Sequence, residues 1–262
     1  MQKIYVITGS TSGIGKALLE RYSQENIVFA GYRNEKLKPE GENIIPFYID
    51  LSKPETIAPA IEYIKNKHNI DTLINAAGCV VAGPLEKISM NELRRQFDVN
   101  TFGALELTKG LNPKKVINIS SMSSFGIYPF IAPYCASKRA MDILFNLYQL
   151  ESGIKVISLK LGSVATPIWS KSIKENSESL ENNKGFESET KYLVKNAMKN
   201  ETQGMPVAKI VDFVYKIDSA KNAKTSYTVG FDAKATEIFS HLPQGFINFV
   251  IGQKLKRMKT IK

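Results

Sequence analysis

The chain has 262 residues, of which 43% are hydrophobic and 23% charged, a composition typical of a globular protein with a sizeable core. No apolar run reaches the roughly 18 residues of a membrane-spanning helix, and no signal-peptide pattern precedes the first apolar run, so we expect a cytoplasmic protein. The two cysteines, Cys79 and Cys135, lack metal-type spacing and the two histidines stand alone, which argues against a metal site and predicts free thiols.

The formal net charge is +10, from 35 basic and 25 acidic residues. Such an excess fits nucleic acid, a membrane surface or an acidic ligand, and it equally fits a lysine-rich, solvated surface. No recognised nucleic-acid-binding motif accompanies the charge, so nucleic acid is not expected as a partner. The net positive charge is concentrated at the C-terminus, where no acidic residue follows Glu237.

Short β-branched runs alternate along the chain with helix-like patterns. We expect strands at 3–8, 26–31, 43–48, 71–78, 114–121, 155–162 and 225–230, and helices from Ser12 or Gly13 and over 53–67, 89–109 and 133–150. This alternation predicts a parallel sheet covered on both faces, with right-handed crossovers. The expected fold is therefore α/β, a doubly wound Rossmann-type sheet of about seven strands in a single domain over 1–262.

The first strand ends in a glycine-rich turn with the spacing G-x-x-x-G-x-G. Glycine permits positive φ and close backbone approach, and the following helix would offer its N–H groups and positive dipole end to a pyrophosphate. A tight connection without a ligand is the alternative. The predicted dinucleotide turn comprises Gly9, Ser10, Thr11, Ser12, Gly13, Ile14 and Gly15.

The second strand ends in Ala30-Gly31-Tyr32-Arg33-Asn34, without the carboxylate that commonly binds the ribose 2′-hydroxyl of NAD. The guanidinium of Arg33 suits a 2′-phosphate, which favours NADP and leaves NAD as the second option. A solvated Arg33 at a strand end is the alternative. Asp50 and Leu51 follow the third strand and are expected near the adenine, although a helix-capping role for Asp50 fits equally well.

Several motifs occur in one order along the chain. They are T-G-x-x-x-G-I-G at 8–15, N-A-A-G at 75–78, Asn100, Ser121, Tyr134-x-x-x-Lys138, "LGSVATPIW" at 161–169 and "YTVG" at 227–230. Over about residues 3–232 this set resembles the short-chain dehydrogenase/reductase family. The stretch "NAAGCVVAGPL" at 75–85 is more similar to its retinol and hydroxysteroid branch than to its acyl-carrier ketoreductase branch.

The resemblance implies an NADP-preferring oxidoreductase that transfers a hydride between the nicotinamide and a carbonyl/alcohol pair. The cofactor contacts that it implies are Asn75, Ala76, Ala77, Gly78, Tyr134, Lys138, Gly162, Val164 and Thr166.

Tyr134 and Lys138 stand four positions apart, on one face of the expected helix. A free tyrosine has a pKa of about 10, and a nearby ammonium together with a positive nicotinamide favours the phenolate. We therefore expect Tyr134 to act as general acid/base, with Ser121 donating to the developing alkoxide. By resemblance, Lys138 also binds the nicotinamide ribose, and Asn100 holds a water that relays protons to Lys138.

The sequence departs from the family pattern in two places. Leu161 replaces a proline, which makes that backbone less rigid. Only 21 positions separate Asn100 from Ser121, about six fewer than the resemblance implies, so the helix between them must be short. Because family members often dimerise through that helix, the usual dimer is in doubt, although a homo-oligomer remains an option.

Aromatic and aliphatic residues flank the expected catalytic residues. Those at 125, 127, 128, 130 and 131 lie between Ser121 and Tyr134, and Trp169 follows the sixth strand. They predict an apolar substrate pocket, with ordinary core filling as the alternative. The substrate-binding residues proposed are Ser121, Phe125, Tyr128 and Trp169.

Two polar segments lie outside the regular pattern. Residues 164–204 are charged and too long for a passive loop, which predicts a mobile helical lid, with a plain surface insertion as the alternative. The tail at 240–262 has apolar residues at 247, 250, 251, 255 and 258, on one face of a basic helix. We favour pocket capping or packing against a second subunit over peripheral contact with an anionic membrane.

A second hypothesis is a dinucleotide-binding regulator without turnover. The complete set of Asn100, Ser121, Tyr134 and Lys138 argues against it, since a protein that only binds the cofactor has no need of Tyr134.

Overall fold

A computed structural model gives the fold of residues 2–126, 128–175 and 183–259. Three predicted features fall partly outside these described residues. They are Ile127 of the apolar stretch, residues 176–182 of the lid and residues 260–262 of the tail.

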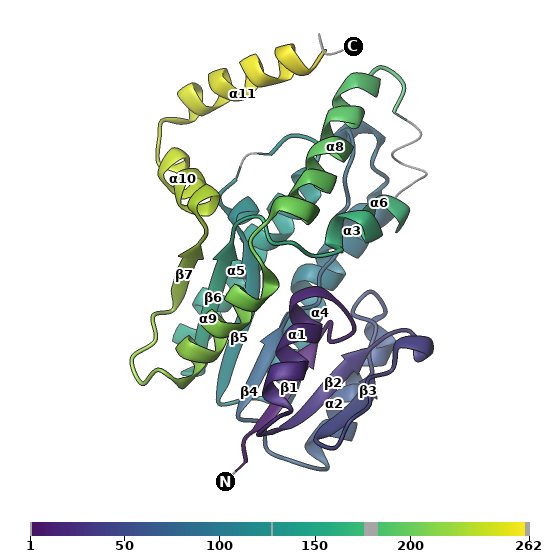
Figure 1. The fold of residues 1–262 in the computed structure, drawn as a ribbon, viewed down its shortest axis with the longest axis vertical. Helices are drawn as coiled ribbons and strands as arrows, with labels where there is room; N and C mark the ends of the chain where they lie inside the picture. Colours follow the sequence, from purple (N-terminus) through teal and green to yellow (C-terminus); the bar gives the residue numbers. More distant parts are fainter. Residues whose placement is uncertain (1, 127, 176–182, 260–262) are drawn as a thin grey trace.

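Seven parallel strands form one sheet in the order β3-β2-β1-β4-β5-β6-β7 (Figure 1). The strands are β1 (Ile4–Thr8), β2 (Ile27–Tyr32), β3 (Ile44–Tyr48), β4 (Thr72–Asn75), β5 (Lys115–Ser121), β6 (Lys155–Leu161) and β7 (Ser226–Val229). The order reverses at β1, whose Ile7 pairs with Ala30 of β2 on one side and Ile74 of β4 on the other. The predicted doubly wound sheet is confirmed, and the gap beside β1 at its carboxyl end is where such folds bind ligands.

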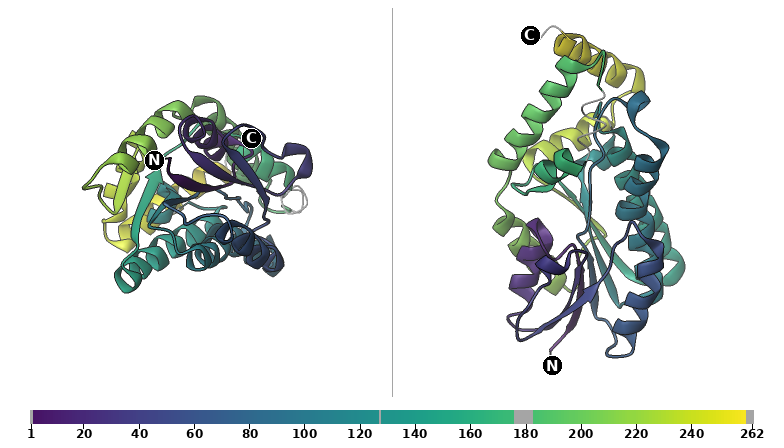
Figure 2. Two further views of the ribbon diagram at one scale, coloured as in Figure 1. Left: turned by 90° about the horizontal axis from the view of Figure 1, so that it is seen from below. Right: turned by 90° about the vertical axis from the view of Figure 1, so that its right-hand side faces the viewer.

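Helices cover both faces of the sheet, as the view along it in Figure 2 shows. They are α1 (Gly13–Tyr22), α2 (Ile57–Lys65), α3 (Met90–Phe97), α4 (Gly103–Leu111), α5 (Ala132–Ser152), α6 (Ile168–Glu175), α8 (Glu187–Gln203), α9 (Val207–Ser219), α10 (Phe231–Ser240) and α11 (Gln244–Lys259). Apolar residues of α1 and α9 pack on one face, and those of α2, α4 and α5 pack on the other. Burial of these two layers is the main force that holds the sheet together.

The helix expected over 89–109 is divided into α3 and α4 by a π-helical turn at Asp98–Phe102. Ser89 and Glu92 form a capping box that starts α3. In the turn, the Thr101 hydroxyl donates to the Ser137 carbonyl oxygen of α5 at 2.8 Å, and Asn100 is buried. The wider turn thus directs polar side chains toward α5, which a regular helix of the same length would not do.

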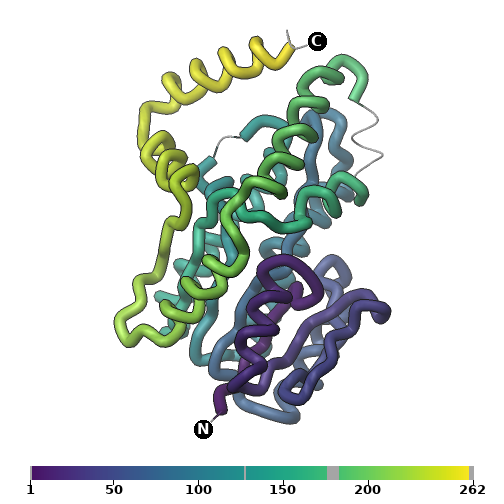
Figure 3. Tube along the Cα trace, in the orientation of Figure 1, coloured from purple at the N-terminus to yellow at the C-terminus, as the bar shows by residue number. Residues whose placement is uncertain are grey.

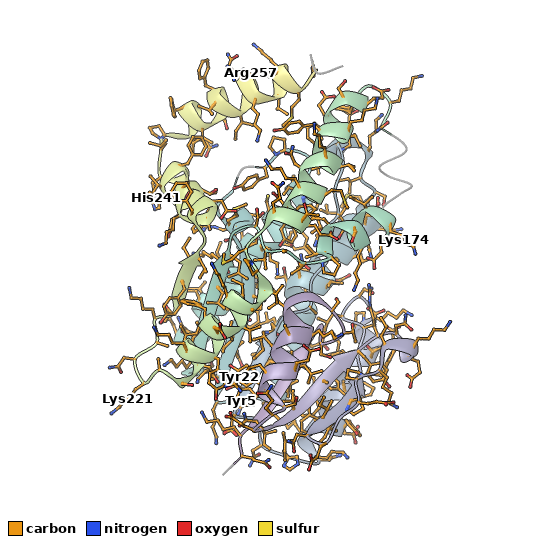
Figure 4. The ribbon with its side chains drawn as sticks, viewed as in Figure 1. Tyr5, Tyr22, Lys174, Lys221, His241 and Arg257 are labelled. Atoms are coloured by element: carbon orange, nitrogen blue, oxygen red, sulfur yellow. The ribbon has the colours of Figure 1, made fainter. Side chains whose placement is uncertain are left out.

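A buried carboxylate connects α9 to the opposite end of the sheet from the glycine-rich turn. Asp218 accepts hydrogen bonds from Tyr5 at 2.7 Å, Tyr22 at 3.3 Å and Lys115 at 2.8 Å. Figure 4 shows Tyr5 and Tyr22 together at that end of the molecule. Burial, reinforced by the Asp218 charge, raises the pKa of both phenols, so each remains a neutral donor to the carboxylate.

The C-terminal part of the chain extends beyond the carboxyl ends of the strands. Figure 3 traces it from α8 back along the sheet through α9 and β7, and then outward again to α10 and α11. Ser170 of α6 bonds to Glu201 of α8 through both its N–H and its hydroxyl, at 2.9 Å each. None of the described helices combines the length and the apolar character that crossing a membrane requires.

Candidate active site

A cavity of about 260 Å³ opens at the carboxyl ends of β1, β4, β5 and β6. It is lined by most of the residues predicted to hold the cofactor or to act in catalysis. These are Gly9, Thr11, Ser12, Gly13, Ile14, Arg33, Asp50, Leu51, Ala76, Ala77, Gly78, Ser121, Tyr134, Lys138, Gly162, Val164, Thr166 and, at the far end, Trp169. Residues up to 160 positions apart in the sequence therefore meet in one continuous space.

The glycine-rich turn has the geometry of an anion cradle. Gly9 and Gly13 have φ of +67° and +54°, which favour glycine. A Cβ on Gly15 would lie 2.3 Å from the Gly9 carbonyl oxygen, so the turn closes only because that position has no side chain. The first turn of α1 contains no acidic residue, and its free N–H groups and positive dipole end lie at the cavity. These features fit the pyrophosphate of a dinucleotide.

Ser10 and Asn75 support the cradle from behind rather than line it. The Ser10 hydroxyl donates to the Gly31 carbonyl oxygen at 2.8 Å, which joins the turn to β2. The Asn75 amide donates to the Asn118 side-chain oxygen at 2.9 Å, between β4 and β5. Both side chains are buried. The sequence placed them in the right motif, but the structure gives them, like Gly15, positioning contacts rather than a place on the cavity wall.

Arg33 and Asp50 line the cavity just beyond the ends of β2 and β3. Arg33 forms an ion pair at 2.5 Å with Glu175, at the end of α6, and Arg95 of α3 approaches the same carboxylate at 3.4 Å. Glu175 was not predicted, because it lies 142 positions from Arg33 and in no motif. One Asp50 oxygen accepts from the N–H and the hydroxyl of Ser52 at 3.0 and 2.7 Å. Asp50 lines the cavity and is the N-cap of neither following helix, since those positions are Lys53 and Thr56; its contact with adenine stays a prediction.

Tyr134 and Ser121 meet at the opposite end of the cavity, where β5 and the first turns of α5 adjoin. Tyr134 is 8% exposed, and burial raises the pKa of its phenol to about 12, an effect that the Ser121 hydroxyl beside it opposes. In the protein without its cofactor, loss of solvent around the phenol outweighs the stabilisation of its anion. The predicted lowering of this pKa by Lys138 together with a bound nicotinamide stays a prediction.

Lys138 is held in place by a backbone carbonyl group. Its ammonium is buried and donates to the Ile119 carbonyl oxygen at 2.9 Å. Burial lowers the pKa of Lys138 to about 8, and the Asp142 carboxylate, one turn further along α5, opposes that effect. The position of the Lys138 ammonium is therefore fixed by this hydrogen bond, while its lowered pKa allows its protonation to change near neutral pH.

Asn100 stands behind Lys138 and outside the cavity lining. Its oxygen accepts from the Cys79 N–H at 3.0 Å, and its amide donates to the Cys79 carbonyl oxygen at 3.0 Å and to the Ser137 hydroxyl at 3.1 Å. A Cβ built on Gly78 would lie 3.5 Å from the Asn100 oxygen and 3.7 Å from the Lys138 nitrogen, so both groups adjoin Gly78. The proton-relay role predicted for Asn100 stays a prediction.

The predicted substrate residues do not all reach the cavity. Trp169 lines it, and Tyr128 packs in the adjoining apolar cluster while its hydroxyl bonds to that of Thr236 on α10 at 2.7 Å. Phe125 is not among the lining residues, and the Lys160 ammonium lies 4.7 Å from its ring centre. Phe125 lies in the 3₁₀ turn at Met122–Phe125, beside Lys160 of β6, and its role in substrate binding stays a prediction.

Three further residues shape the cavity without any sequence signal. Asp232 of α10 accepts from the Ser163 N–H at 2.7 Å and fixes the segment after β6. The buried Ser172 of α6 accepts from the Val80 N–H at 3.2 Å, and Gln96 accepts from the Val81 N–H and donates to the Cys79 carbonyl oxygen at 2.8 Å. Each residue holds a loop around the cavity through a hydrogen bond to a residue distant in the sequence, and such a contact cannot be predicted from a local sequence pattern.

Comparison with known proteins gives the same family over most of the chain. The family model for short chain dehydrogenases matches residues 3–177. An uncharacterized oxidoreductase, YusZ, of Bacillus subtilis is 25% identical over 92% of this chain and 94% of its own length. An NADPH-dependent 3-dehydrocapnine reductase of Ornithobacterium rhinotracheale is 28% identical over 63% of this chain and 67% of its own.

Solved structures agree on the fold. A short-chain dehydrogenase from Streptomyces avermitilis superposes with a TM-score of 0.74 at 20% identity, covering 98% of this chain and 97% of the other. One from Burkholderia cenocepacia in complex with NADP gives 0.72 at 22% identity, covering 95% and 98%. The matched segment contains the glycine-rich turn, Ser121, Tyr134 and Lys138, all of which meet at the cavity. The chain therefore belongs to the short-chain dehydrogenase family and is an oxidoreductase.

Proposed function

We propose that this protein is an NADP(H)-dependent oxidoreductase that interconverts a carbonyl group and the corresponding alcohol on an apolar substrate. One observation carries the proposal: a single cavity joins an anion cradle at α1 to the half-buried Ser121 at the end of β5 and the buried Tyr134 at the start of α5. A dinucleotide whose pyrophosphate rests on the cradle would extend toward Tyr134. The nicotinamide supplies or accepts the hydride when bound.

The chain's own residues manage the proton. Tyr134 donates its phenolic proton to the carbonyl oxygen during reduction and takes a proton from the hydroxyl during oxidation. Ser121, beside the phenol, donates to the same oxygen as charge develops on it. Lys138, fixed on the Ile119 carbonyl, supplies positive charge that favours the phenolate once the site is filled. The low exposure of Tyr134 keeps water away from the transfer.

The preference for NADP rests on Arg33. Its guanidinium lies at the adenosine end of the cavity, where it can bind a 2′-phosphate through paired hydrogen bonds. The Ornithobacterium relative is named as NADPH-dependent, and the Burkholderia structure holds NADP, both of which favour this choice. NAD is the second option, since a 4-hydroxyisoleucine dehydrogenase that superposes with a TM-score of 0.71 at 24% identity is complexed with NADH.

The apolar character of the substrate rests on the cluster around Tyr134. Val80, Ala82, Ile131 and Cys135 are buried beside it, and Tyr128, Ile168, Trp169 and Leu193 pack against them from neighbouring segments. Ile168 and Trp169 come from α6, and Leu193 comes from α8. The described parts of the predicted lid, 164–175 and 183–204, thus contribute side chains to the cluster around Tyr134, which supports the proposal that they act as a lid over the substrate.

A second copy of the chain remains part of the proposal. Ile143, Leu147 and Leu150 are 47%, 48% and 73% exposed and follow one another at helical spacing along α5. Such a stripe is typical of a helix that another subunit covers. The α4 helix beside it has nine residues against 21 in α5, so the pairing would rest mainly on α5. Light scattering of the wild type and of Leu147→Ser/Leu150→Ser measures it.

The decisive experiment is a screen of carbonyl compounds with NADPH consumption as the readout, run beside the Tyr134→Phe variant. We expect turnover on at least one apolar ketone or aldehyde, lost in the variant while NADPH binding, measured by its fluorescence, is kept. Cofactor binding without turnover of any compound would favour the alternative of a dinucleotide-binding regulator.

A further inference from the structure

The α11 helix has two different faces. At 100° per residue, the positions of Ile247, Ile251, Leu255 and Met258 share one side, and Ile247 and Met258 on that side are 1% and 6% exposed. This inner face packs on α8, and the Lys254 ammonium lies 6.0 Å from the Tyr192 ring centre there. The position of α11 is therefore set by apolar contacts with the lid segment.

The opposite side, which we call the outer face, is apolar in its first half and basic in its second. Phe246, Phe249 and Val250 are 51%, 63% and 37% exposed. The sequence placed Val250 on the inner face and gave no role to the two phenylalanines. Gln253, Lys256 and Arg257 continue the outer face toward the end of the helix and are exposed. Ile238 of α10, 72% exposed, adds apolar surface on the preceding helix.

Figure 1 shows α11 as the outermost element at the carboxyl end of the sheet, standing clear of the strands. Figure 4 places Arg257 at this edge of the molecule. None of the residues that line the described cavity belongs to α11, whereas Asn200 of α8 does line it. The expectation that the tail caps the pocket directly is thus not met, and α11 lies one helix away from the site.

We propose that the outer face of α11 docks on an anionic lipid surface. Two phenylalanines and a valine at one end can enter the headgroup region, while the cations at the other end remain among the phosphates. The charge distribution favours this occupant, because Glu237 is the last acidic residue and Lys254, Lys256, Arg257, Lys259 and Lys262 follow it. Binding should therefore require both apolar insertion and negative headgroups.

A second copy of the chain fits the outer face less well. Two outer faces related by a two-fold axis would bring the basic ends of both helices into a shared interface, with no acidic side chain after Glu237 to offset them. Nucleic acid also fits less well, because the exposed phenylalanines occupy the end of the helix away from the cations instead of alternating with them for stacking.

The test is flotation of the full-length protein with vesicles. We expect it to float with vesicles of phosphatidylcholine and phosphatidylglycerol, and about tenfold less with phosphatidylcholine alone or at high salt. Phe246→Ser/Phe249→Ser and Lys256→Glu/Lys259→Glu should each reduce the floating fraction by about tenfold. The matched controls are Leu37→Ser/Tyr63→Ser, which removes exposed apolar side chains outside α5 and α11, and Lys221→Glu/Lys224→Glu, which removes exposed cations outside α11. Figure 4 shows Lys221 at the opposite end of the molecule from Arg257.

Each variant is first checked for an unchanged melting temperature and for NADPH binding, which separates loss of docking from loss of the fold or of the proposed activity. Equal flotation of wild type and α11 variants, or no flotation at all, overturns the proposal. So does a dimer that the Phe246→Ser/Phe249→Ser variant dissolves, because the face would then belong to a second copy. Retention of RNA or DNA that the same cationic substitutions abolish, without flotation, would assign it to nucleic acid.

Discussion

The two halves of the site are built in different ways. Up to β6, the groups that face the cavity stand at strand ends or in the first turns of helices, and backbone contacts such as Gly15 against the Gly9 carbonyl hold them. Beyond β6, the lining residues come from the 162–167 segment, α6 and α8. The two helices are fixed by side-chain contacts such as Arg33 with Glu175 and Ser170 with Glu201. We infer that the first half carries the chemistry and the second half governs what enters.

If the chemistry belongs to the first half, removing one oxygen there should have the largest effect. Tyr134→Phe should lower turnover by about 10²–10⁴-fold and leave the melting temperature nearly unchanged, since the ring still fills its place. Steady-state kinetics on the substrate found in the screen measures it. Tyr215→Phe is the matched control: it removes only a hydroxyl bonded to Glu25, outside the cavity lining, and its turnover should stay within a few-fold of wild type. Equal losses in the two variants would refute the role of Tyr134.

The boundary between the halves can be examined at Arg33. Arg33→Ala should weaken NADPH binding about ten- to a hundredfold and leave NADH binding nearly unchanged, because a charge-assisted bond to the 2′-phosphate is lost. Fluorescence titration with both cofactors measures the difference. Arg94→Ala, an exposed arginine on α3, is the control and should alter neither. Parallel weakening of NADPH and NADH would show that Arg33 has no part in the choice.

The pH dependence should separate the two directions of the reaction. The pKa of Tyr134 is raised to about 12 by burial, so the phenolate that oxidation requires is the minor form at neutral pH and increases with pH. We expect kcat/KM for alcohol oxidation to rise between about pH 6 and 8, by up to tenfold per unit. Reduction needs the phenol, which is already the major form, and should stay nearly flat. An oxidation rate that falls as pH rises contradicts the assignment.

The second half should give the smallest effect, at Glu175. The Glu175 carboxylate forms an ion pair with the Arg33 guanidinium and so competes with a 2′-phosphate for it. Glu175→Gln should therefore tighten NADPH binding. Both side chains are partly exposed, which limits the gain to at most about fivefold. Glu86→Gln, an exposed carboxylate whose ion pair is with the neighbouring Lys87, serves as the control. Weaker NADPH binding in Glu175→Gln would mean that the carboxylate supports the cofactor rather than competing with it.

The sequence predicted what local backbone and fixed spacing determine. Gly9 and Gly13 were found because a turn with positive φ requires glycine, and the Tyr134–Lys138 pair was found because residues four positions apart share a helix face. Glu175 and Asp232 could not be found, since their partners are distant in the chain. Phe125 shows a limit of the sequence: the residue is near the catalytic residues along the chain, but the 3₁₀ turn places its ring beside Lys160 and outside the cavity lining, which sequence distance does not reveal.

The hydrogen bonds to the Asp218 carboxylate limit when the N-terminal part of the chain can fold during synthesis on the ribosome. Tyr5 and Tyr22 emerge about 200 residues before the acceptor that satisfies their hydroxyls, and Lys115 emerges about 100 residues before it. Until α9 is made, closing the N-terminal layer would bury two phenols without acceptors, at a cost of about 1–3 kcal/mol each. A nascent chain that ends before α9 should therefore stay open to proteases, and the fold becomes complete only when its C-terminal part arrives.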